Sequence, residues 1–140
     1  MKKFIISIDA GTTSNRSILF DLKGKPIYSS QKEFTQYFPK SGWVEHNPDE
    51  IWKTTIKTLK DVIKKAKKLK GKILSIGITN QRETTVLWDK KTGRPVYKAI
   101  VWQDRRTEEF CKKLRKQNKD TMVFNKTGLL IDSYFSGTKI

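Results

Sequence analysis

The sequence predicts an α/β fold built on a mixed β-sheet. Short apolar segments separated by turn residues fill the first part of the chain, and one long amphipathic segment and another apolar segment follow. Strands joined by tight turns pair antiparallel, whereas a helical crossover brings the next strand in parallel. At 140 residues the chain has the length of one ordinary domain, which can bury a substantial core.

Three strands are expected before the long helix. Apolar and β-branched residues predict strands at 4–8, 17–20 and 26–34. The second and third are joined through Lys23-Gly24-Lys25, in which a glycine favours a tight turn. These strands therefore form an antiparallel trio.

The segment 48–70 predicts a helix with one apolar and one basic face. Asn47 can cap its first turn, Pro48 suits the first helical position, and Asp49 and Glu50 complement the helix dipole. Apolar residues recur at helical spacing: Trp52, Ile56, Leu59, Ile63 and Ala66. Lysines trace the opposite stripe: Lys53, Lys57, Lys60, Lys64 and Lys67. We interpret that stripe as a solvated helix face.

Further elements follow the helix. The segment 73–78 predicts a strand parallel to the first, 85–89 and 97–101 predict two more strands, and 104–116 predicts a second helix. Three antiparallel strands, a helix and a parallel strand are the order of a ribonuclease-H-like fold. The ends of the first and fourth strands then meet, and ligands gather at such carboxyl ends in open sheets.

Composition limits the partners of the chain. Its net charge is +16, but it has 24 lysines and only 6 arginines, whereas proteins that read bases and phosphates favour arginine. We expect weak polyanion binding at low salt and no specific nucleic-acid site. No apolar run reaches the roughly 18 residues of a membrane span, and no signal-peptide core follows Met1. A soluble cytoplasmic protein without a membrane partner is expected.

The segment between the first two strands has the composition of a phosphate-binding turn. Gly11 permits a tight turn, and the hydroxyls and N–H groups that follow it at 12–14 can bind an anion. Asp9 can hold a hydrated Mg²⁺ ion, and Arg16 can neutralise phosphate charge. Taken alone, this composition suits an ordinary polar hairpin turn equally well.

The phosphate turn and four later segments together resemble the N-terminal part of the glycerol kinases, which belong to the FGGY family of carbohydrate kinases. The resemblance extends from Phe4 to the last residue. The later segments are Trp43–Pro48, Gly77–Thr85, Val101–Thr107 and Thr127–Lys139. It implies the N-terminal part of an actin-type ATPase fold over residues 1–140, and ATP-dependent phosphorylation of glycerol to sn-glycerol 3-phosphate.

The resemblance also assigns roles to individual residues. It implies that Thr12, Thr13 and Ser14 contact the ATP phosphates and that Arg16 lies beside them, with ATP and Mg²⁺ as the cofactors. The residues that it implies for glycerol binding are Arg82, Glu83, Trp102 and Tyr134. Without the resemblance, the Arg82–Glu83 pair reads as a surface ion pair, and the two aromatic residues read as ordinary core.

Two departures from the glycerol kinases stand out. They usually carry glutamine where this chain has Ala10. The aspartate that serves as their general base, their second phosphate loop and their adenosine pocket lie beyond position 140. We therefore expect a truncated form that is inactive alone. The alternatives are a non-catalytic glycerol- or phosphate-binding module, one subunit of a split kinase completed by a second polypeptide and, more distantly, a basic nucleic-acid-binding protein.

Overall fold

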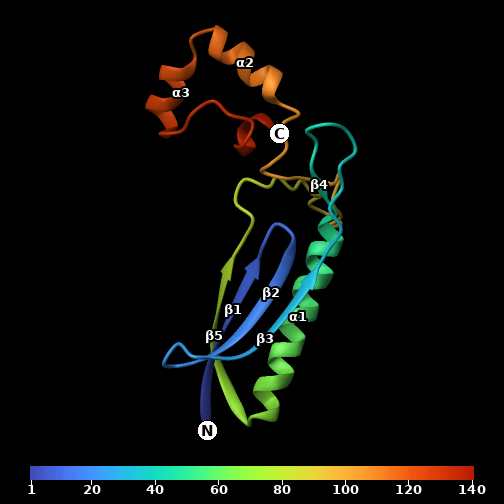
Figure 1. The fold of residues 1–140 in the computed structure, drawn as a ribbon, viewed down its shortest axis with the longest axis vertical. Coiled ribbons are helices and arrows are strands. Elements are labelled where there is room, and N and C mark those ends of the chain that lie inside the picture. Colours follow the sequence, from blue (N-terminus) through green and yellow to red (C-terminus); the bar gives the residue numbers. More distant parts are fainter. The chain divides into compact units, whose positions relative to one another are not determined.

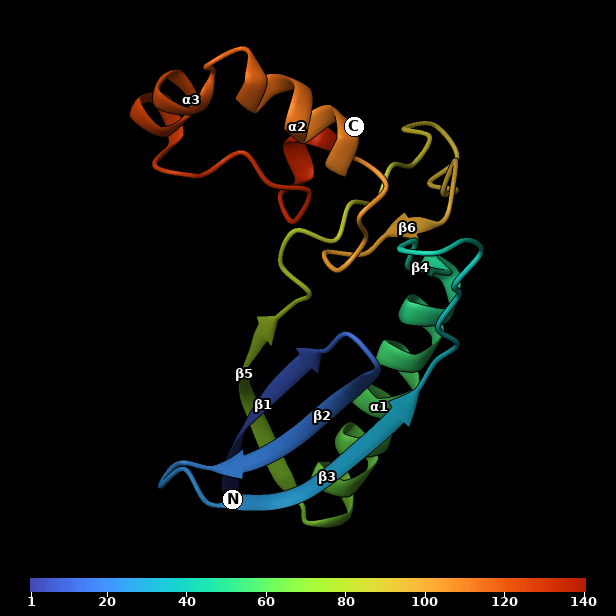
Figure 2. The ribbon, with the colours of Figure 1, turned by 45° about the horizontal axis from the view of Figure 1, so that its top comes forward.

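The computed structural model describes residues 1–140, which form two compact units (Figures 1 and 2). Unit 1 comprises Met1–Thr35 and Asn47–Gln81, and unit 2 comprises Gln36–His46 and Arg82–Ile140. No helix is long and apolar enough to cross a lipid bilayer.

Unit 1 contains a four-stranded mixed sheet in the order β3-β2-β1-β5. Its strands are β1 (Lys2–Ala10), β2 (Ser14–Asp21), β3 (Pro26–Glu33) and β5 (Gly71–Thr79). β2 pairs antiparallel with both β1 and β3, and β5 pairs parallel with β1. The predicted antiparallel trio and the parallel fourth strand are confirmed, and each strand except β3 is longer than the sequence predicted.

Helix α1 (Pro48–Lys68) packs across one face of this sheet (Figure 1). The Asn47 side chain accepts a hydrogen bond from the Asp49 N–H at 2.9 Å, which confirms the predicted N-cap. Val62 and Ala66 meet apolar side chains of β1 and β2 in the core, whose buried members are Phe4, Ile6, Ile8, Leu19, Val62 and Ala66. Burying this apolar surface is what holds α1 on the sheet.

Polar contacts fix the position of α1 along the sheet near the first turn. The Asn15 side chain donates to the Ile51 carbonyl at 2.9 Å and to the Thr54 hydroxyl at 2.6 Å. One turn further along, the hydroxyls of Ser17 and Thr58 are 2.9 Å apart in a buried contact. Because buried polar groups are costly when unpaired, these bonds select one register of helix against sheet.

Gly71 allows α1 to return tightly into β5. A Cβ atom at this position would collide with the ring of Phe4, whose side chain is buried in the core. We expect Gly71→Ala to lower the free energy of unfolding of unit 1 by about 1–3 kcal/mol, the usual cost of overpacking. Denaturant unfolding followed by circular dichroism checks this value. The control is Gly77→Ala, where a Cβ atom meets nothing, and it is expected to change stability less.

Unit 2 has little regular sheet. It contains β4 (Glu45–His46), β6 (Ala99–Ile100), α2 (Glu108–Lys116), α3 (Asp120–Thr127) and a 3-10 turn at Ser136–Thr138. β4 and β6 pair antiparallel. Neither β4 nor α3 was expected from the sequence pattern.

Two predicted strands are corrected in this unit. The segment 85–89 is not a strand: Thr85 and Trp88 each form only an isolated bridge, to Ile100 and to Pro95. Its end is drawn into a turn because the Asp89 carboxylate accepts from the N–H groups of Lys91 and Thr92. The predicted strand 97–101 is reduced to Ala99–Ile100, since its only ladder partner is the two-residue β4.

The second helix begins later than predicted, at Glu108 rather than at position 104. Asp104 is fully buried, and its carboxylate accepts from the backbone N–H groups of Val44 at 2.6 Å and of Arg106 at 2.8 Å. These bonds hold residues 104–106 in a non-helical turn. The hydrogen bond from the distant Val44 N–H to Asp104 therefore prevents the helix from starting where the local sequence pattern predicted.

Candidate functional site

The predicted phosphate turn is the tip of the β1–β2 hairpin in unit 1. The Gly11 N–H donates to the Ser14 carbonyl at 3.0 Å and closes the turn. A Cβ atom on residue 11 would lie 3.0 Å from that same carbonyl oxygen. Glycine therefore permits the close backbone approach on which a phosphate-binding turn depends.

A row of polar residues crosses the sheet beside this turn. Register places Asp9 opposite Arg16 and Arg16 opposite Gln31. Their side chains lie on the sheet face away from α1, because Ile8, Asn15 and Ser17 alternate with them and face the helix. The strand pairing thus brings the predicted residues Asp9 and Arg16 together.

Gln31 connects the predicted phosphate ligands, a role that was not expected from the sequence. Its amide oxygen accepts from Arg16 Nε at 3.0 Å, and its amide nitrogen donates to Ser14 Oγ at 2.8 Å. Gln31 orients both side chains at the hairpin. No local motif marks it, because it enters the site only through β2–β3 pairing.

The carboxylate of Asp9 fits Mg²⁺ but not a metal that needs a protein cage. The structure contains no group of three or more histidine, cysteine, aspartate or glutamate residues placed to share an ion. Mg²⁺ keeps most of its water shell and is commonly held by one or two carboxylates together with substrate phosphates. An exposed aspartate at the end of a strand beside the turn satisfies that requirement.

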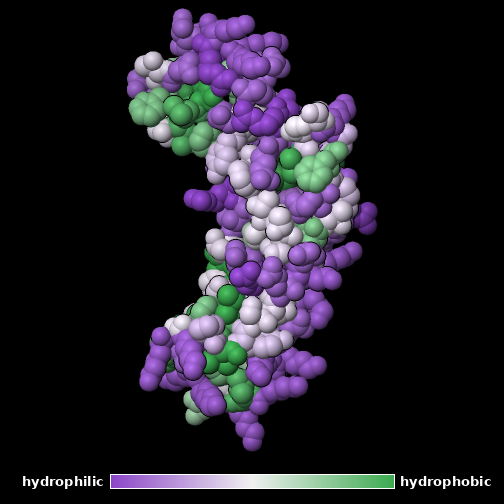
Figure 3. Space-filling model, in the orientation of Figure 1, coloured by the Kyte–Doolittle hydropathy of each residue, from purple (hydrophilic) through white to green (hydrophobic).

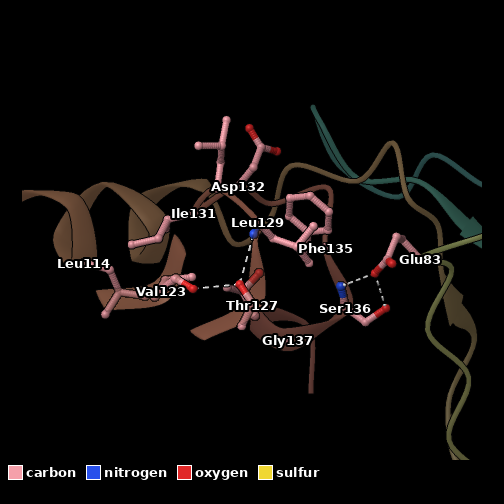
Figure 4. A pocket seen from close by; sticks show the side chains of 12 residues that line it. Glu83, Leu114, Val123, Thr127, Leu129, Ile131, Asp132, Phe135, Ser136 and Gly137 are labelled. Atoms are coloured by element: carbon pink, nitrogen blue, oxygen red, sulfur yellow. Dashed lines mark hydrogen bonds between the residues drawn. The ribbon is translucent and has the colours of Figure 1, made fainter. Parts of the chain in front are cut away.

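The remaining predicted residues belong to unit 2, where Glu83 is fixed by the segment 134–139. Its carboxylate accepts hydrogen bonds from both the backbone N–H and the hydroxyl of Ser136, each at 2.8 Å (Figure 4). These bonds, assisted by the charges of Lys139 and Arg82, lower the pKa of Glu83 below its usual range. Glu83 is thus an ionised hydrogen-bond acceptor at neutral pH, and Arg82 beside it is exposed.

The backbone of Glu83 is strained. Its φ is +64°, in the left-handed region that residues other than glycine rarely adopt. Such strain persists only where the surroundings impose it, and it is concentrated at binding and catalytic sites. The bonds from Ser136 supply that constraint here.

Trp102 and Tyr134, both predicted for glycerol binding, pack against each other. Their ring centroids are 5.7 Å apart in an edge-to-face arrangement, and Phe135 meets Tyr134 in the same way at 5.1 Å. Both Trp102 and Tyr134 are half-buried. This geometry leaves part of each aromatic surface available to the C–H side of a small polyol.

Lys139 links Glu83 to Tyr134, although no sequence pattern gave it a role. Its ammonium group donates to the Glu83 carbonyl at 3.0 Å and to the Tyr134 carbonyl at 2.7 Å. Burial lowers the pKa of Lys139 even though Asp104, Glu83 and Asp132 favour its charged form. Lys139 and Ser136 act as positioning residues for the predicted glycerol ligands. Only the fold, which brings 134–139 against residue 83, identifies them.

Loss of the Lys139 contacts gives a testable effect. We expect Lys139→Met, which keeps an unbranched side chain without the charge, to destabilise unit 2 by about 2 kcal/mol, because charge-assisted hydrogen bonds contribute about 1.5–3 kcal/mol. Denaturant unfolding followed by tryptophan fluorescence measures the change. Lys126→Met, at an exposed lysine of the same unit, is the control. Equal stability of the two variants would contradict the linking role.

A mainly apolar pocket of about 290 Å³ adjoins Glu83 in unit 2. Figure 4 shows Glu83 and Ser136 at one side of it and aliphatic side chains of α2, α3 and the following loop at the other. Leu114, Val123 and Ile131 are among its lining residues. Glu83 is the only predicted glycerol ligand in its wall, so the pocket lies beside the predicted glycerol site and does not enclose it.

Comparisons with known proteins agree with the motifs. Residues 4–140 match the N-terminal domain of the FGGY family of carbohydrate kinases. The chain is 60% identical to a glycerol kinase of Oceanobacillus iheyensis and 59% identical to one of Malacoplasma penetrans, in each case over 99% of its own length. It covers 28% and 27% of those relatives.

A solved structure gives the same result. The crystal structure of Plasmodium falciparum glycerol kinase with ADP matches 99% of this chain with a TM-score of 0.92 and 36% identity, and the chain covers 28% of it. The predicted ribonuclease-H-like fold of the actin-type ATPases is thereby confirmed. The chain spans little more than a quarter of the length of these relatives. It belongs to the FGGY family of carbohydrate kinases, whose N-terminal domain it matches.

Proposed function

We propose that this chain supplies the N-terminal part of an ATP-dependent kinase that converts glycerol to sn-glycerol 3-phosphate. The observation that carries the proposal is its identity of 56–60% with glycerol kinases over essentially its full length. The arrangement of Glu83, Trp102 and Tyr134 supports it, since Lys139 binds the carbonyls of Glu83 and Tyr134, and the Trp102 ring packs against Tyr134. Phosphoryl transfer depends mainly on positioning and on stabilising charge.

In unit 1, the proposed role of the β1–β2 hairpin is to hold the phosphates. Backbone N–H groups and hydroxyls of Thr12, Thr13 and Ser14 bind phosphate oxygens, and Arg16, held by Gln31, adds positive charge. Asp9 holds Mg²⁺ through its water shell. When bound, ATP with Mg²⁺ supplies the transferable phosphoryl group.

In unit 2, the proposed role of the Glu83 region is to bind glycerol. The ionised carboxylate of Glu83 accepts a hydrogen bond from a glycerol hydroxyl, and Arg82 donates one. Tyr134 offers its hydroxyl, and the Trp102 ring covers the carbon backbone. Charged partners matched to hydroxyls discriminate strongly against analogues that lack them.

We further propose that polypeptide outside these 140 residues supplies the general base and the adenosine site. Losing a general base commonly costs about 10² to 10⁴ in rate. A protein made only of these residues is therefore expected to show no glycerol-dependent ATP turnover at the rate of the complete relatives. We place the protein in the cytoplasm, because an ATP-dependent kinase acts where ATP is held, and its one cysteine is free and buried.

The test is a complementation assay. The chain is mixed with a polypeptide comprising the remaining part of the Oceanobacillus iheyensis relative, and the phosphorylated product is measured by mass spectrometry with glycerol, xylulose or gluconate as substrate. We expect product from glycerol in the mixture and none from the chain alone. Phosphorylation of a sugar substrate but not of glycerol would overturn the proposed substrate. Product from the chain alone would overturn its dependence on further polypeptide.

A further inference from the structure

One end of the unit 1 sheet gathers exposed lysines from separate strands. β1 begins at Lys2 and pairs in parallel with the start of β5, so Lys3 lies opposite Lys72. This is the end of the sheet farthest along β1 from the Gly11 turn. The lysine charges thus lie at the opposite end from the proposed phosphate site of the same unit.

The β2–β3 turn and the C-terminus of α1 lie at the same end of the sheet as the first residues of β1 and β5. Phe4 pairs with Asp21 at the close of β2, and the turn that follows carries Lys23 and Lys25. Lys68 is the last residue of α1, just before the chain enters β5. Six of the exposed lysines at this end are called the basic pole: Lys2, Lys3, Lys23, Lys25, Lys68 and Lys72.

The lysines of the basic pole outnumber the acidic groups near them. The Asp21 carboxylate accepts from the backbone N–H groups of Lys23 at 2.8 Å and of Lys25 at 3.0 Å, which caps the turn. Asp61 on α1 is paired with Lys57 at 2.9 Å. None of the lysines of the basic pole forms a salt bridge. The pole therefore presents concentrated positive charge.

An apolar pocket lies within the basic pole. Its wall includes Phe4, Ile27 and Leu69. Met1 and Leu22 also line it, and they are 88% and 56% exposed. Figure 3 shows hydrophobic surface between hydrophilic side chains at the end of unit 1 that carries the N-terminus. Exposed aliphatic groups surrounded by lysines are typical of surfaces that settle into a lipid interface.

We propose that the basic pole docks this protein peripherally on an anionic phospholipid surface, a partner that the sequence pattern did not predict, with the lysines near the headgroups and Met1 and Leu22 in the interfacial layer. Charge complementarity favours an anionic lipid surface as the partner, because each lysine near an anionic leaflet raises the membrane partition coefficient of a protein by about five-fold. The same charge disfavours a second copy of this chain, whose pole would repel it. A nucleic acid matches the pole less well, because it offers no counterpart for the exposed aliphatic side chains and because lysine lacks arginine's planar fork.

Vesicle co-sedimentation tests the proposal with the 140-residue chain. The probes are vesicles of equimolar phosphatidylglycerol and phosphatidylcholine, and vesicles of phosphatidylcholine alone, at an ionic strength of about 0.15 M. We expect binding to the anionic vesicles only. The quadruple variant Lys23→Gln, Lys25→Gln, Lys68→Gln and Lys72→Gln is expected to reduce the partition coefficient by about 100-fold or more.

A control with the same net charge separates the pole from overall charge. It carries Lys90→Gln, Lys91→Gln, Lys119→Gln and Lys126→Gln, four exposed lysines of unit 2, and is expected to bind nearly as the parent chain does. Leu22→Ser is expected to weaken vesicle binding. The binding that remains is expected to depend more strongly on salt concentration, because it rests on the lysine charges. Circular dichroism verifies that every variant is folded.

Three results would overturn the proposal. The first is absence of binding to the anionic vesicles, and the second is equal loss of binding in the two quadruple variants. The third is binding to single-stranded RNA at the same ionic strength that exceeds vesicle binding and is lost in the pole variant. That last result would assign the pole to nucleic acid instead.

Discussion

Replacing Asp104 by alanine is expected to lower the free energy of unfolding of unit 2 by about 3–5 kcal/mol, because it removes one of the two carboxylates that pair with the buried Arg106 and leaves the Val44 N–H without its acceptor. Arg106 Nη2 lies 2.9 Å from Asp104 Oδ2 and 2.8 Å from Glu45 Oε1. The side chains of all three residues are largely buried. The guanidinium also lies 3.7 Å from the centre of the Trp43 ring.

The measurement is denaturant unfolding followed by tryptophan fluorescence. Trp43, Trp88 and Trp102 report on unit 2, whereas Trp52 reports on unit 1, so Trp52→Phe confines the signal to unit 2. Glu109→Ala is the control, since Glu109 forms an exposed pair with Lys112 that is expected to contribute less than about 1 kcal/mol. A cost for Asp104→Ala as small as that of the control would contradict the account of the buried cluster.

The same cluster gives unit 2 a defined acid sensitivity. Burial opposes ionisation of Asp104, but hydrogen bonds from Arg106 and from the Val44 N–H outweigh it and lower the pKa of Asp104. A lowered pKa stabilises the folded state fully above the ordinary aspartate value of about 3.9, and this contribution is lost as the pH falls below it. We expect unit 2 to lose stability below about pH 4 in the parent chain, and Asp104→Asn to show a weaker dependence, which comes from the lowered pKa of other carboxylates such as Glu83. Denaturant unfolding repeated across this pH range measures both.

Removing the charges of the proposed glycerol site is expected to have the largest effect on binding. Arg82→Ala, or Glu83→Gln, should weaken glycerol binding by about 10- to 100-fold in the complemented protein, since hydrogen bonds to charged groups contribute about 1.5–3 kcal/mol. Isothermal titration calorimetry measures the affinity. Arg94→Ala, at an exposed arginine of the same unit, is the control for Arg82.

The pH dependence of glycerol binding follows from the same carboxylate. Hydrogen bonds from Ser136 lower the pKa of Glu83, so the carboxylate stays ionised as the pH falls to the ordinary glutamate value of about 4.3. Affinity is therefore expected to be constant from neutral pH to about pH 5. Ser136→Ala removes one of the two bonds and is expected to shift the loss of binding to higher pH. A loss that begins near neutral pH in the parent chain would contradict this assignment.

The sequence alone determined the framework of unit 1. Alternating apolar residues, the Gly24 turn and the Asn47 cap specify three antiparallel strands and a long helix, because such periodic patterns act over only a few residues. The crossover rule then placed the strand after the helix in parallel beside the first, as β5 lies. The family could also be predicted from the sequence, because the residues that carry the resemblance form contiguous motifs in the chain.

Only the tertiary structure decided which residues that are distant in the sequence contact one another. It showed that Asp104 binds the Val44 N–H, which shortens α2 at its start, and that Glu45 and His46 form the strand that pairs with 99–100. It also identified Gln31 and Lys139, which hold the predicted ligands in place. Such contacts join residues tens of positions apart, and their energies depend on burial and detailed geometry, neither of which a local sequence pattern contains.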